Sequence, residues 1–193
     1  VIHDGNRVFA FTGRGGGSIA VDVNGSGDIG EEHTAWTGRD TASFASPVQH
    51  RSRLYVVASG IVTAVDAQSG ERLQRLRLKG VRRSGGRFGS LDYPSPVIAG
   101  DHMFYLNGSG QMFVLSLGDE VRQVRINEVT QDKEDFRGTP AISGSRMILR
   151  SSKYVYCVTD KGDTVAEPQV TKADPEEPAP SDGGRRRGRF DPM

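Results

Sequence analysis

A glycine-rich stretch near the amino end, residues 12–18 (TGRGGGS), has the composition of a phosphate-binding loop. A loop of that kind is followed by a helix whose amino end faces the phosphate, with a Lys, Ser or Thr placed for the metal ion. The residues that follow here, 19–23 (IAVDV), are typical of a β-strand instead. We therefore interpret residues 12–18 as a slightly long hairpin turn, with anion binding as the alternative.

A second stretch, residues 79–89 (KGVRRSGGRFG), is basic and rich in glycine. Its arginines, Arg82, Arg83 and Arg87, could donate hydrogen bonds to an anion or an acidic partner, and Phe88 could anchor such a contact. The alternative is a solvated loop without a partner. These four residues form the partner-contact loop that the sequence predicts.

The charges of the chain are balanced, with 25 Lys and Arg against 24 Asp and Glu in 193 residues. The chain therefore has no large net positive charge that would attract it to nucleic acid or to an anionic membrane. Residues 127–137 (NEVTQDKEDFR) correspond in position to the basic stretch but are mixed and acidic, so the two stretches do not form one basic stripe. We predict no nucleic-acid partner. The apolar runs are far shorter than the roughly 20 residues that span a bilayer, so we also predict no transmembrane segment.

The single cysteine, Cys157, excludes an internal disulfide and a thiolate metal cluster within this chain. It lies in residues 154–158 (YVYCV), an alternating strand pattern in which we predict that Cys157 and Val155 are buried; a reactive thiol is the alternative. None of the histidines forms a pair at the spacing of a metal site, and they are His3, His33, His50 and His102. We therefore assign no catalytic, cofactor-binding or metal-binding residue.

The elements that would position these residues repeat along the chain. Residues 46–73 (SPVQHRSRLYVVASGIVTAVDAQSGERL) contain a Ser-Pro opening, two strands joined by a glycine turn and the start of a third strand. The opening proline recurs as Pro47, Pro96 and Pro140, at spacings of 96 − 47 = 49 and 140 − 96 = 44 residues. A period in the forties, filled by short strands and tight turns without a helical pattern, is typical of β-propeller blades.

We predict an all-β fold, a partial β-propeller of about four blades, each an antiparallel sheet of four strands. The blades are expected near residues 1–45, 46–94, 95–138 and 139–167. Residues 168–193 are rich in Pro, Gly and Arg and poor in apolar residues, so we expect a disordered carboxy-terminal tail. The chain begins with Val1 and its first copy lacks the Ser-Pro opening, so we expect that further blades of the same protein precede it.

The only tryptophan, Trp36, falls in the outer strand of the first predicted blade. An indole wedged between neighbouring blades would bury a large apolar surface and donate one hydrogen bond. We predict that Trp36 serves structural packing between blades, with ligand stacking as the alternative. At the turn that ends the repeat, Asp66 could accept hydrogen bonds from backbone amides beyond it, and Gly70 could adopt a positive φ.

Three motifs resemble the repeats of PQQ-like β-propellers. They are the Ser-Pro-Val opening at residues 46–48, the turn Val-Asp-Ala-Gln-Ser-Gly-Glu at residues 65–71 and the closing stretch SSKYVYCVTDKG at residues 151–162. This superfamily includes PQQ-binding-like repeat proteins, BamB-like proteins and quinoprotein alcohol dehydrogenases. The resemblance covers roughly residues 1–165 and implies the carboxy-terminal portion of such a propeller. It is more specific for fold than for function.

The resemblance implies two functions. The first is a non-catalytic interaction scaffold of the bacterial cell envelope, periplasmic or secreted, that contacts a protein or polymer partner through loops of a propeller face and needs no cofactor. The alternative is a fragment of a PQQ- and Ca²⁺-dependent quinoprotein alcohol dehydrogenase. Those enzymes often use a vicinal cysteine pair, which Cys157 alone cannot form, and a tryptophan in almost every blade, where this chain has only Trp36. We therefore favour the scaffold. A cytosolic WD40-type propeller is a third interpretation, which the lack of a Trp-Asp signature disfavours.

Overall fold

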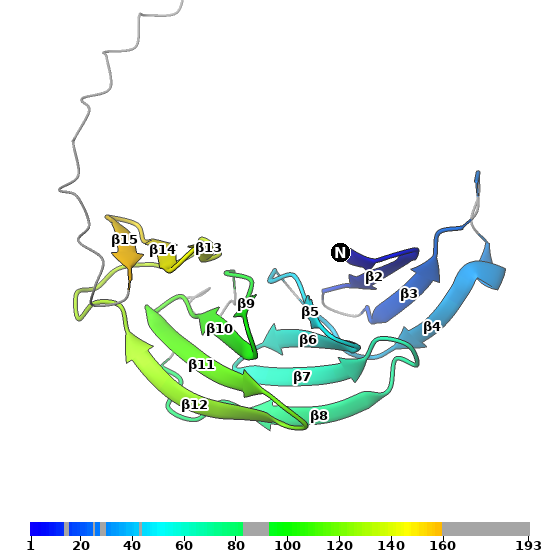
Figure 1. The fold of residues 1–193 in the computed structure, drawn as a ribbon, viewed down its shortest axis with the longest axis horizontal. Coiled ribbons are helices and arrows are strands. Elements are labelled where there is room, and N and C mark those ends of the chain that lie inside the picture. Colours follow the sequence, from blue (N-terminus) through cyan, green and yellow to red (C-terminus); the bar gives the residue numbers. More distant parts are fainter. Residues whose placement is uncertain (14–15, 25, 28–29, 43, 83–92, 160–193) are drawn as a thin grey trace, which may run out of the picture. The chain divides into compact units, whose positions relative to one another are not determined.

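The computed structural model describes residues 1–13, 16–24, 26–27, 30–42, 44–82 and 93–159. Within these residues the chain forms fifteen β-strands and one short 3₁₀ helix. The strands make up four antiparallel sheets, and each sheet keeps its strands in chain order (Figure 1). In the described part of the chain, no helix has the length and apolar character needed to cross a membrane.

Each sheet corresponds to one repeat of the sequence. The first sheet contains β1 (Ile2–Asp4), β2 (Arg7–Phe11), β3 (Ser18–Asp22) and β4 (Thr34–Gly38), with the 3₁₀ helix η1 (Glu31–His33) before its last strand. The second contains β5 (Val48–His50), β6 (Arg53–Ala58), β7 (Ile61–Asp66) and β8 (Arg72–Arg77). The third contains β9 (Val97–Ala99), β10 (His102–Leu106), β11 (Gln111–Leu117) and β12 (Val121–Glu128). The described part of the fourth contains β13 (Ala141–Ser143), β14 (Arg146–Arg150) and β15 (Val155–Val158).

The β6–β7 hairpin shows how the sequence sets a tight turn. Ser59 and Gly60 form a two-residue connection between the paired residues Ala58 and Ile61. Both central residues have positive φ, 53° at Ser59 and 71° at Gly60. Two positive φ values are typical of a type I′ turn, whose twist matches that of the flanking strands. The Ser-Gly pair therefore closes the hairpin and fixes its register.

The turn between β7 and β8 is closed by a side chain. The Oδ1 atom of Asp66 accepts hydrogen bonds from the backbone N–H of Gln68 at 3.0 Å and of Ser69 at 2.7 Å. Gly70 follows with φ of 75°. These contacts confirm the prediction from sequence for this turn. They also lower the pKa of Asp66, chiefly through the N–H of Ser69, because the hydrogen bonds stabilise the carboxylate.

The middle strands of the second sheet are buried on both faces. All four residues 54–57 of β6 are at most 2% exposed. Because successive side chains of a strand point to opposite faces, this run means that both faces of the sheet are covered. Leu54 belongs to a core cluster with Phe9 of the first sheet, whereas Tyr55 belongs to a cluster with Tyr105 of the third sheet. The second sheet is therefore sandwiched as a blade between its neighbours.

The fourth sheet departs from the sequence prediction in its burial. Cys157 is exposed and Val155 is 68% exposed, so the prediction that both are buried was wrong. The reason is that Val155 and Cys157 point to one face of β15, opposite to Tyr156, which packs against a core cluster, and no sheet of the described residues covers the face of Val155 and Cys157. The end of the predicted fourth blade, residues 160–167, and the predicted tail, residues 168–193, lie outside the described residues.

Candidate functional site

Arg82 belongs to the predicted partner-contact loop and lies in the connection that leaves β8. The other three predicted residues, Arg83, Arg87 and Phe88, lie outside the described residues. The guanidinium of Arg82 pairs with Glu128 at the end of β12, with 3.1 Å between Nη2 and Oε1. The two side chains are 53% and 45% exposed, so solvent screens the pair and it contributes little to stability. The guanidinium is therefore accessible from outside.

Two buried amide side chains hold the backbone that leads to Arg82. The Oε1 atom of Gln111 accepts the backbone N–H of Arg82 at 2.7 Å, and its Nε2 donates to the carbonyl oxygen of Gly80 at 2.9 Å. Asn107 donates through Nδ2 to the same Oε1 at 3.0 Å. Because Gln111 and Asn107 are buried, their polar groups need these partners. The segment from Gly80 to Arg82 is thus fastened to the β10–β11 hairpin.

The connection from β12 to β13 is also held in place by backbone hydrogen bonds and packing. The backbone N–H of Phe136 donates to the carbonyl oxygen of Gly108 at 3.1 Å, and the N–H of Ser152 donates to the carbonyl oxygen of Asp135 at 2.8 Å. The ring of Phe136 is fully buried and covers Gly110, where a Cβ would lie 2.7 Å from the ring. The third and fourth sheets therefore hold this connection between them.

Glu134 is a buried carboxylate in the same connection. It is only 8% exposed, and its Oε1 atom accepts a hydrogen bond from the hydroxyl of Tyr156 at 2.8 Å. Its other oxygen, Oε2, is buried and has no hydrogen-bond partner among the described residues. Burial and, next, the hydrogen bond to Glu134 raise the pKa of Tyr156, so its hydroxyl remains a donor at neutral pH.

The segments described above line a cavity of about 620 Å³ between loops of the second, third and fourth sheets. Its lining consists of Arg82, Ser109, Ser152 and residues 130–135. Among the described residues of this lining, the ionisable side chains are three carboxylates and two cations, and hydroxyl groups lie among them. The volume falls in the range of roughly 300–1,000 Å³ that is typical of ligand pockets. Such a lining can hold a polar or charged group through hydrogen bonds.

The sequence alone pointed to Arg82 in this cavity but missed Glu134, Tyr156 and Gln111. The acidic residues of the 127–137 stretch look alike in the sequence, and residue type does not show which of them is buried. One signal was present, because Phe136 is a large apolar residue inside this polar stretch. An aromatic anchor in a loop marks the point where the loop packs on the fold.

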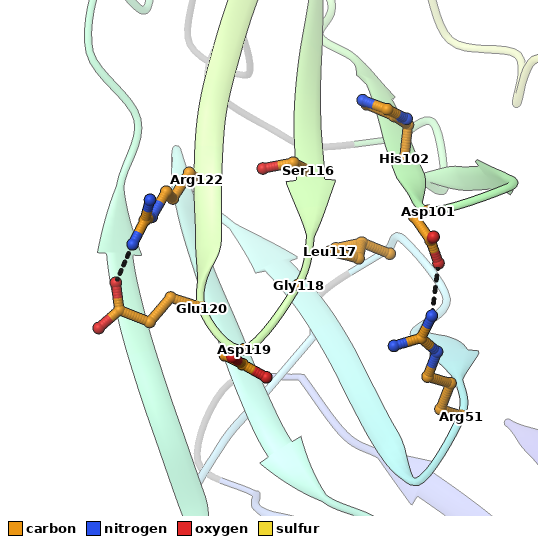
Figure 2. Close-up of a pocket in the computed structure, with 9 residues that line it drawn as sticks. All are labelled: Arg51, Asp101, His102, Ser116, Leu117, Gly118, Asp119, Glu120 and Arg122. Atoms are coloured by element: carbon orange, nitrogen blue, oxygen red, sulfur yellow. Dashed lines mark hydrogen bonds and ion pairs between the residues drawn. The ribbon is translucent and has the colours of Figure 1, made fainter.

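A second cavity, of about 370 Å³, lies between the second and third sheets at the opposite ends of their strands (Figure 2). Arg51 in the β5–β6 turn donates to Asp101 in the β9–β10 turn at 2.9 Å, and Arg122 pairs with Glu120 at 3.3 Å. All four side chains are more than 60% exposed. Because each of these charges already has a partner, we interpret this cavity as a polar joint between two blades.

Trp36, predicted to pack between blades, lies in β4 and is 7% exposed. Its Nε1 donates to the carbonyl oxygen of Ala67 in the second sheet at 3.0 Å. The indole shares a core cluster with Leu54 and Val65 of that sheet. A Cβ on Gly70 would lie 2.5 Å from the indole ring, so the ring rests directly on the β7–β8 turn.

The dehydrogenase alternative requires a Ca²⁺ ion held by carboxylate and amide oxygens. Among the described residues, no group of three His, Cys, Asp or Glu side chains is placed to hold a metal ion. The described part of the chain therefore shows no cluster of such side chains for this ion.

Comparison with solved structures defines the class of protein. The chain is similar to the crystal structure of BamB from Moraxella catarrhalis, with a TM-score of 0.59 and 17% identity, covering 81% of this chain and 46% of that chain. A weaker likeness is to a europium-containing methanol dehydrogenase, with a TM-score of 0.45 and 10% identity, covering 64% of this chain and 23% of that chain. Another is to Hsv2 from Kluyvelomyces marxianus, with a TM-score of 0.44 and 13% identity, covering 82% of this chain and 61% of that chain. The four stacked antiparallel sheets and the likeness to BamB show a β-propeller fold.

The family follows from the sequence match. The family model described as outer membrane protein assembly factor BamB matches residues 58–180. The chain therefore belongs to this family of PQQ-like repeat propellers. It spans about half the length of the BamB structure that it matches, 46% of that chain. No curated protein gives a significant match.

Proposed function

We propose that this chain is part of a non-catalytic interaction scaffold of the bacterial cell envelope, periplasmic or secreted. Family membership supports the envelope, because the family is described as an outer membrane protein assembly factor. The chain corresponds to 46% of the BamB structure that it matches, so the role of the whole protein is inferred from a part of it. The partner in this proposal is a protein or polymer of the envelope.

One observation carries the proposal: among the described residues, the segment from Gly80 to Arg82 and the β12–β13 connection are held in place by hydrogen bonds and packing. The side chain of Gln111 accepts the backbone N–H of Arg82, and the buried ring of Phe136 anchors the β12–β13 connection, which also lines the cavity. A surface whose loops are already ordered loses little conformational entropy when it binds. It also presents an accessible cation and several carboxylates at fixed positions, which favours a specific polar contact.

In this proposal Arg82 makes first contact with the partner, and Arg83, Arg87 and Phe88 extend the contact along the same connection. An exposed arginine suits this role, because its planar guanidinium offers several N–H donors. It can exchange its exposed ion pair with Glu128 for an ion pair with a carboxylate of the partner. The opposite ends of the strands, around Arg51 and Asp101, are not part of the contact.

Site-specific photo-crosslinking in cells that produce the full-length protein tests the proposal. A photoreactive amino acid replaces Arg82 in one variant and Arg122, which lies at the opposite strand ends, in a matched control. We expect a discrete adduct with one envelope component from position 82 and none from position 122. The absence of an adduct at position 82, or the same adducts from both positions, would overturn the proposal.

A further inference from the structure

Three side chains that occupy the same position in successive repeats lie in a row. Phe44, Tyr93 and Arg137 each lie three residues before the opening proline of a repeat (47 − 44, 96 − 93 and 140 − 137). The ring centroids of Phe44 and Tyr93 are 4.8 Å apart, and the guanidinium carbon of Arg137 lies 5.5 Å from the centroid of the Tyr93 ring. These three residues, which we call the aromatic–arginine row, link the β4–β5, β8–β9 and β12–β13 connections.

The row adjoins the surface that the proposed function assigns to a partner. Tyr93 lies in the same β8–β9 connection as Arg82. Arg137 pairs with Asp135, which lines the 620 Å³ cavity. A partner that covers Arg82 and this cavity therefore has the row within its reach.

The row is exposed, unlike the aromatic residues that hold the blades together. Phe44 is 55% exposed, and it is the one exposed phenylalanine among the residues that the structure describes. Trp36 and Phe136, which pack between blades, are 7% and 0% exposed. Contacts within the row orient the ring of Phe44 without covering it. An exposed aromatic ring that is already held by a neighbour is suited to anchor a partner, and aromatic residues are enriched at protein interfaces.

Arg137 supplies the charge of the row. Its ion pair with Asp135 is 3.8 Å long, and both side chains are more than 60% exposed, so the pair is weak. A guanidinium that lies over an aromatic ring keeps its N–H donors at its edge, where they can bind a planar carboxylate through two parallel hydrogen bonds. A carboxylate of the partner can therefore replace Asp135.

We propose that the aromatic–arginine row binds an extended peptide segment of the partner, which packs an aromatic side chain on Phe44 and pairs a carboxylate with Arg137. The inference rests on the proposed function, because it names the chemistry by which the partner is recognised. The two distances place the guanidinium within roughly 10 Å of the Phe44 ring, and residues i and i+3 of a polyproline II segment lie on one side about 9 Å apart. The segment therefore carries an aromatic residue and, three positions away, Asp or Glu.

A glycan fits the row less well than a peptide. Tyr93 is half-buried and contacts both Phe44 and Arg137, so the row presents one ring and one cation rather than several ring faces side by side. Neutral sugar hydroxyls also give a guanidinium weaker hydrogen bonds than a carboxylate does, because only one partner of each bond is charged. These observations favour an acidic peptide.

Binding of a short peptide to the full-length protein tests the inference. The probe is acetyl-Phe-Ala-Ala-Glu-amide. One matched control, acetyl-Phe-Ala-Ala-Gln-amide, lacks the charge, and the other, acetyl-Ala-Ala-Ala-Glu-amide, lacks the ring. The protein variants are Phe44→Ala and Arg137→Gln, with Arg122→Gln at the opposite strand ends as the control for an exposed arginine. NMR titration gives the dissociation constants, and thermal midpoints confirm that each variant is folded.

We expect the probe to bind the wild type and Arg122→Gln equally, with a Kd of about 1 mM for a ligand of this size. Arg137→Gln should weaken binding of the probe about threefold to tenfold, since a charge-assisted hydrogen bond is lost, and should leave binding of the Gln peptide unchanged. Phe44→Ala should weaken binding of the probe by a similar factor and should leave binding of the peptide without the ring unchanged.

Two results would overturn the inference: no saturable binding of the probe up to about 10 mM, or a loss in Arg137→Gln that is the same for the Glu and Gln peptides. A tetramer of N-acetylglucosamine is the probe for a glycan. Its saturable binding to the wild type but not to Phe44→Ala would also contradict the assignment of a peptide. If the peptide fails while a photoreactive residue at position 82 still captures an envelope component, the proposed function stands without this row.

Discussion

The hydroxyl of Ser95 accepts a hydrogen bond from the backbone N–H of Ser46 at 2.8 Å, across the boundary between the second and third sheets. Ser95 repeats the arrangement, since its own N–H donates to Oγ1 of Thr139 at 3.0 Å. These three residues each precede the opening proline of a repeat. The Ser/Thr-Pro motif therefore joins successive blades as well as starting the second, third and fourth.

Replacing Ser95 with alanine should destabilise the protein by about 1 kcal/mol, because the N–H of Ser46 loses its acceptor. Urea unfolding of the wild type and the variant measures the difference. Ser52→Ala, in the exposed β5–β6 turn, is the matched control and should change stability by less than about 0.5 kcal/mol. Equal effects of the two substitutions would show that the hydroxyl link contributes nothing.

Replacing Gln74 with alanine should cost more, about 1–3 kcal/mol. The side chain of Gln74 makes two hydrogen bonds to the backbone of Val121 in the third sheet. Its Oε1 accepts the N–H of Val121 at 2.7 Å, and its Nε2 donates to the carbonyl oxygen of Val121 at 3.0 Å. Val121 is 2% exposed, so water replaces these bonds poorly. Chemical denaturation tests this, with Gln68→Ala at an exposed glutamine as the control; a loss no larger than that of the control contradicts the prediction.

Gly70→Ala should destabilise the protein by about 2 kcal/mol or more. Two causes add, because φ at Gly70 is 75° and a Cβ there would lie 2.5 Å from the ring of Trp36. Gly100→Ala is an informative control, since φ is 56° but no atom lies within 4 Å of its Cβ, so only the backbone cost of about 1 kcal/mol remains. Thermal unfolding followed by the fluorescence of Trp36 compares them. A penalty at Gly70 equal to that at Gly100 would mean that the indole does not rest on this turn.

The stability that Asp66 contributes should depend on pH. Its pKa is lowered in the folded protein, chiefly by the N–H of Ser69. A group with a lowered folded pKa stabilises the fold above its unfolded pKa, about 4 for Asp, and this stabilisation is lost as the pH falls through the folded value. Asp66→Asn keeps a neutral acceptor, as Asn107 does at the β10–β11 turn. The variant should be less stable than the wild type at pH 7, and the difference should shrink below about pH 4. A difference that is constant with pH would contradict this.

The repeated sheets and their turns were predictable from the sequence, because strand patterns and turn residues act locally. Asp66 caps its turn and Gly70 has a positive φ, as their residue types indicate. The recurrence of Pro47 and Pro96 gave the boundaries of the repeats, although it did not reveal the hydroxyl link between blades.

The candidate site was less predictable, because it depends on contacts between distant loops. Glu134 looks like its exposed neighbours, and only the packing of the third and fourth sheets buries it. Gln74 and Gln123 look like solvent-facing positions of outer strands, although their spacing of 123 − 74 = 49 residues equals one repeat. Both side chains bind backbone across a blade boundary, Gln123 through the N–H of Lys79 at 2.8 Å. A polar residue that recurs at the repeat spacing was the available signal.

Cys157 shows the opposite error. A side chain of a strand is buried only when another sheet covers the face to which it points, and no sheet of the described residues covers the face of Val155 and Cys157. The exposed thiol has a practical use, since Cys157→Ser gives a background without cysteine in this chain, in which single cysteines report accessibility.

The central claim is that a partner in the cell covers Arg82 and the loops that line the 620 Å³ cavity beside it. Single cysteines at Ser109, in the lining of the 620 Å³ cavity, and at Asp119, at the opposite strand ends, test it most directly in the Cys157→Ser background. A membrane-impermeant maleimide is applied to cells with a permeabilised outer membrane and to the purified full-length protein. The account predicts that Ser109→Cys is labelled several-fold more slowly in cells than when purified, while Asp119→Cys is labelled equally in both. Equal labelling of Ser109→Cys in the two settings, or protection of Asp119→Cys instead, would contradict it.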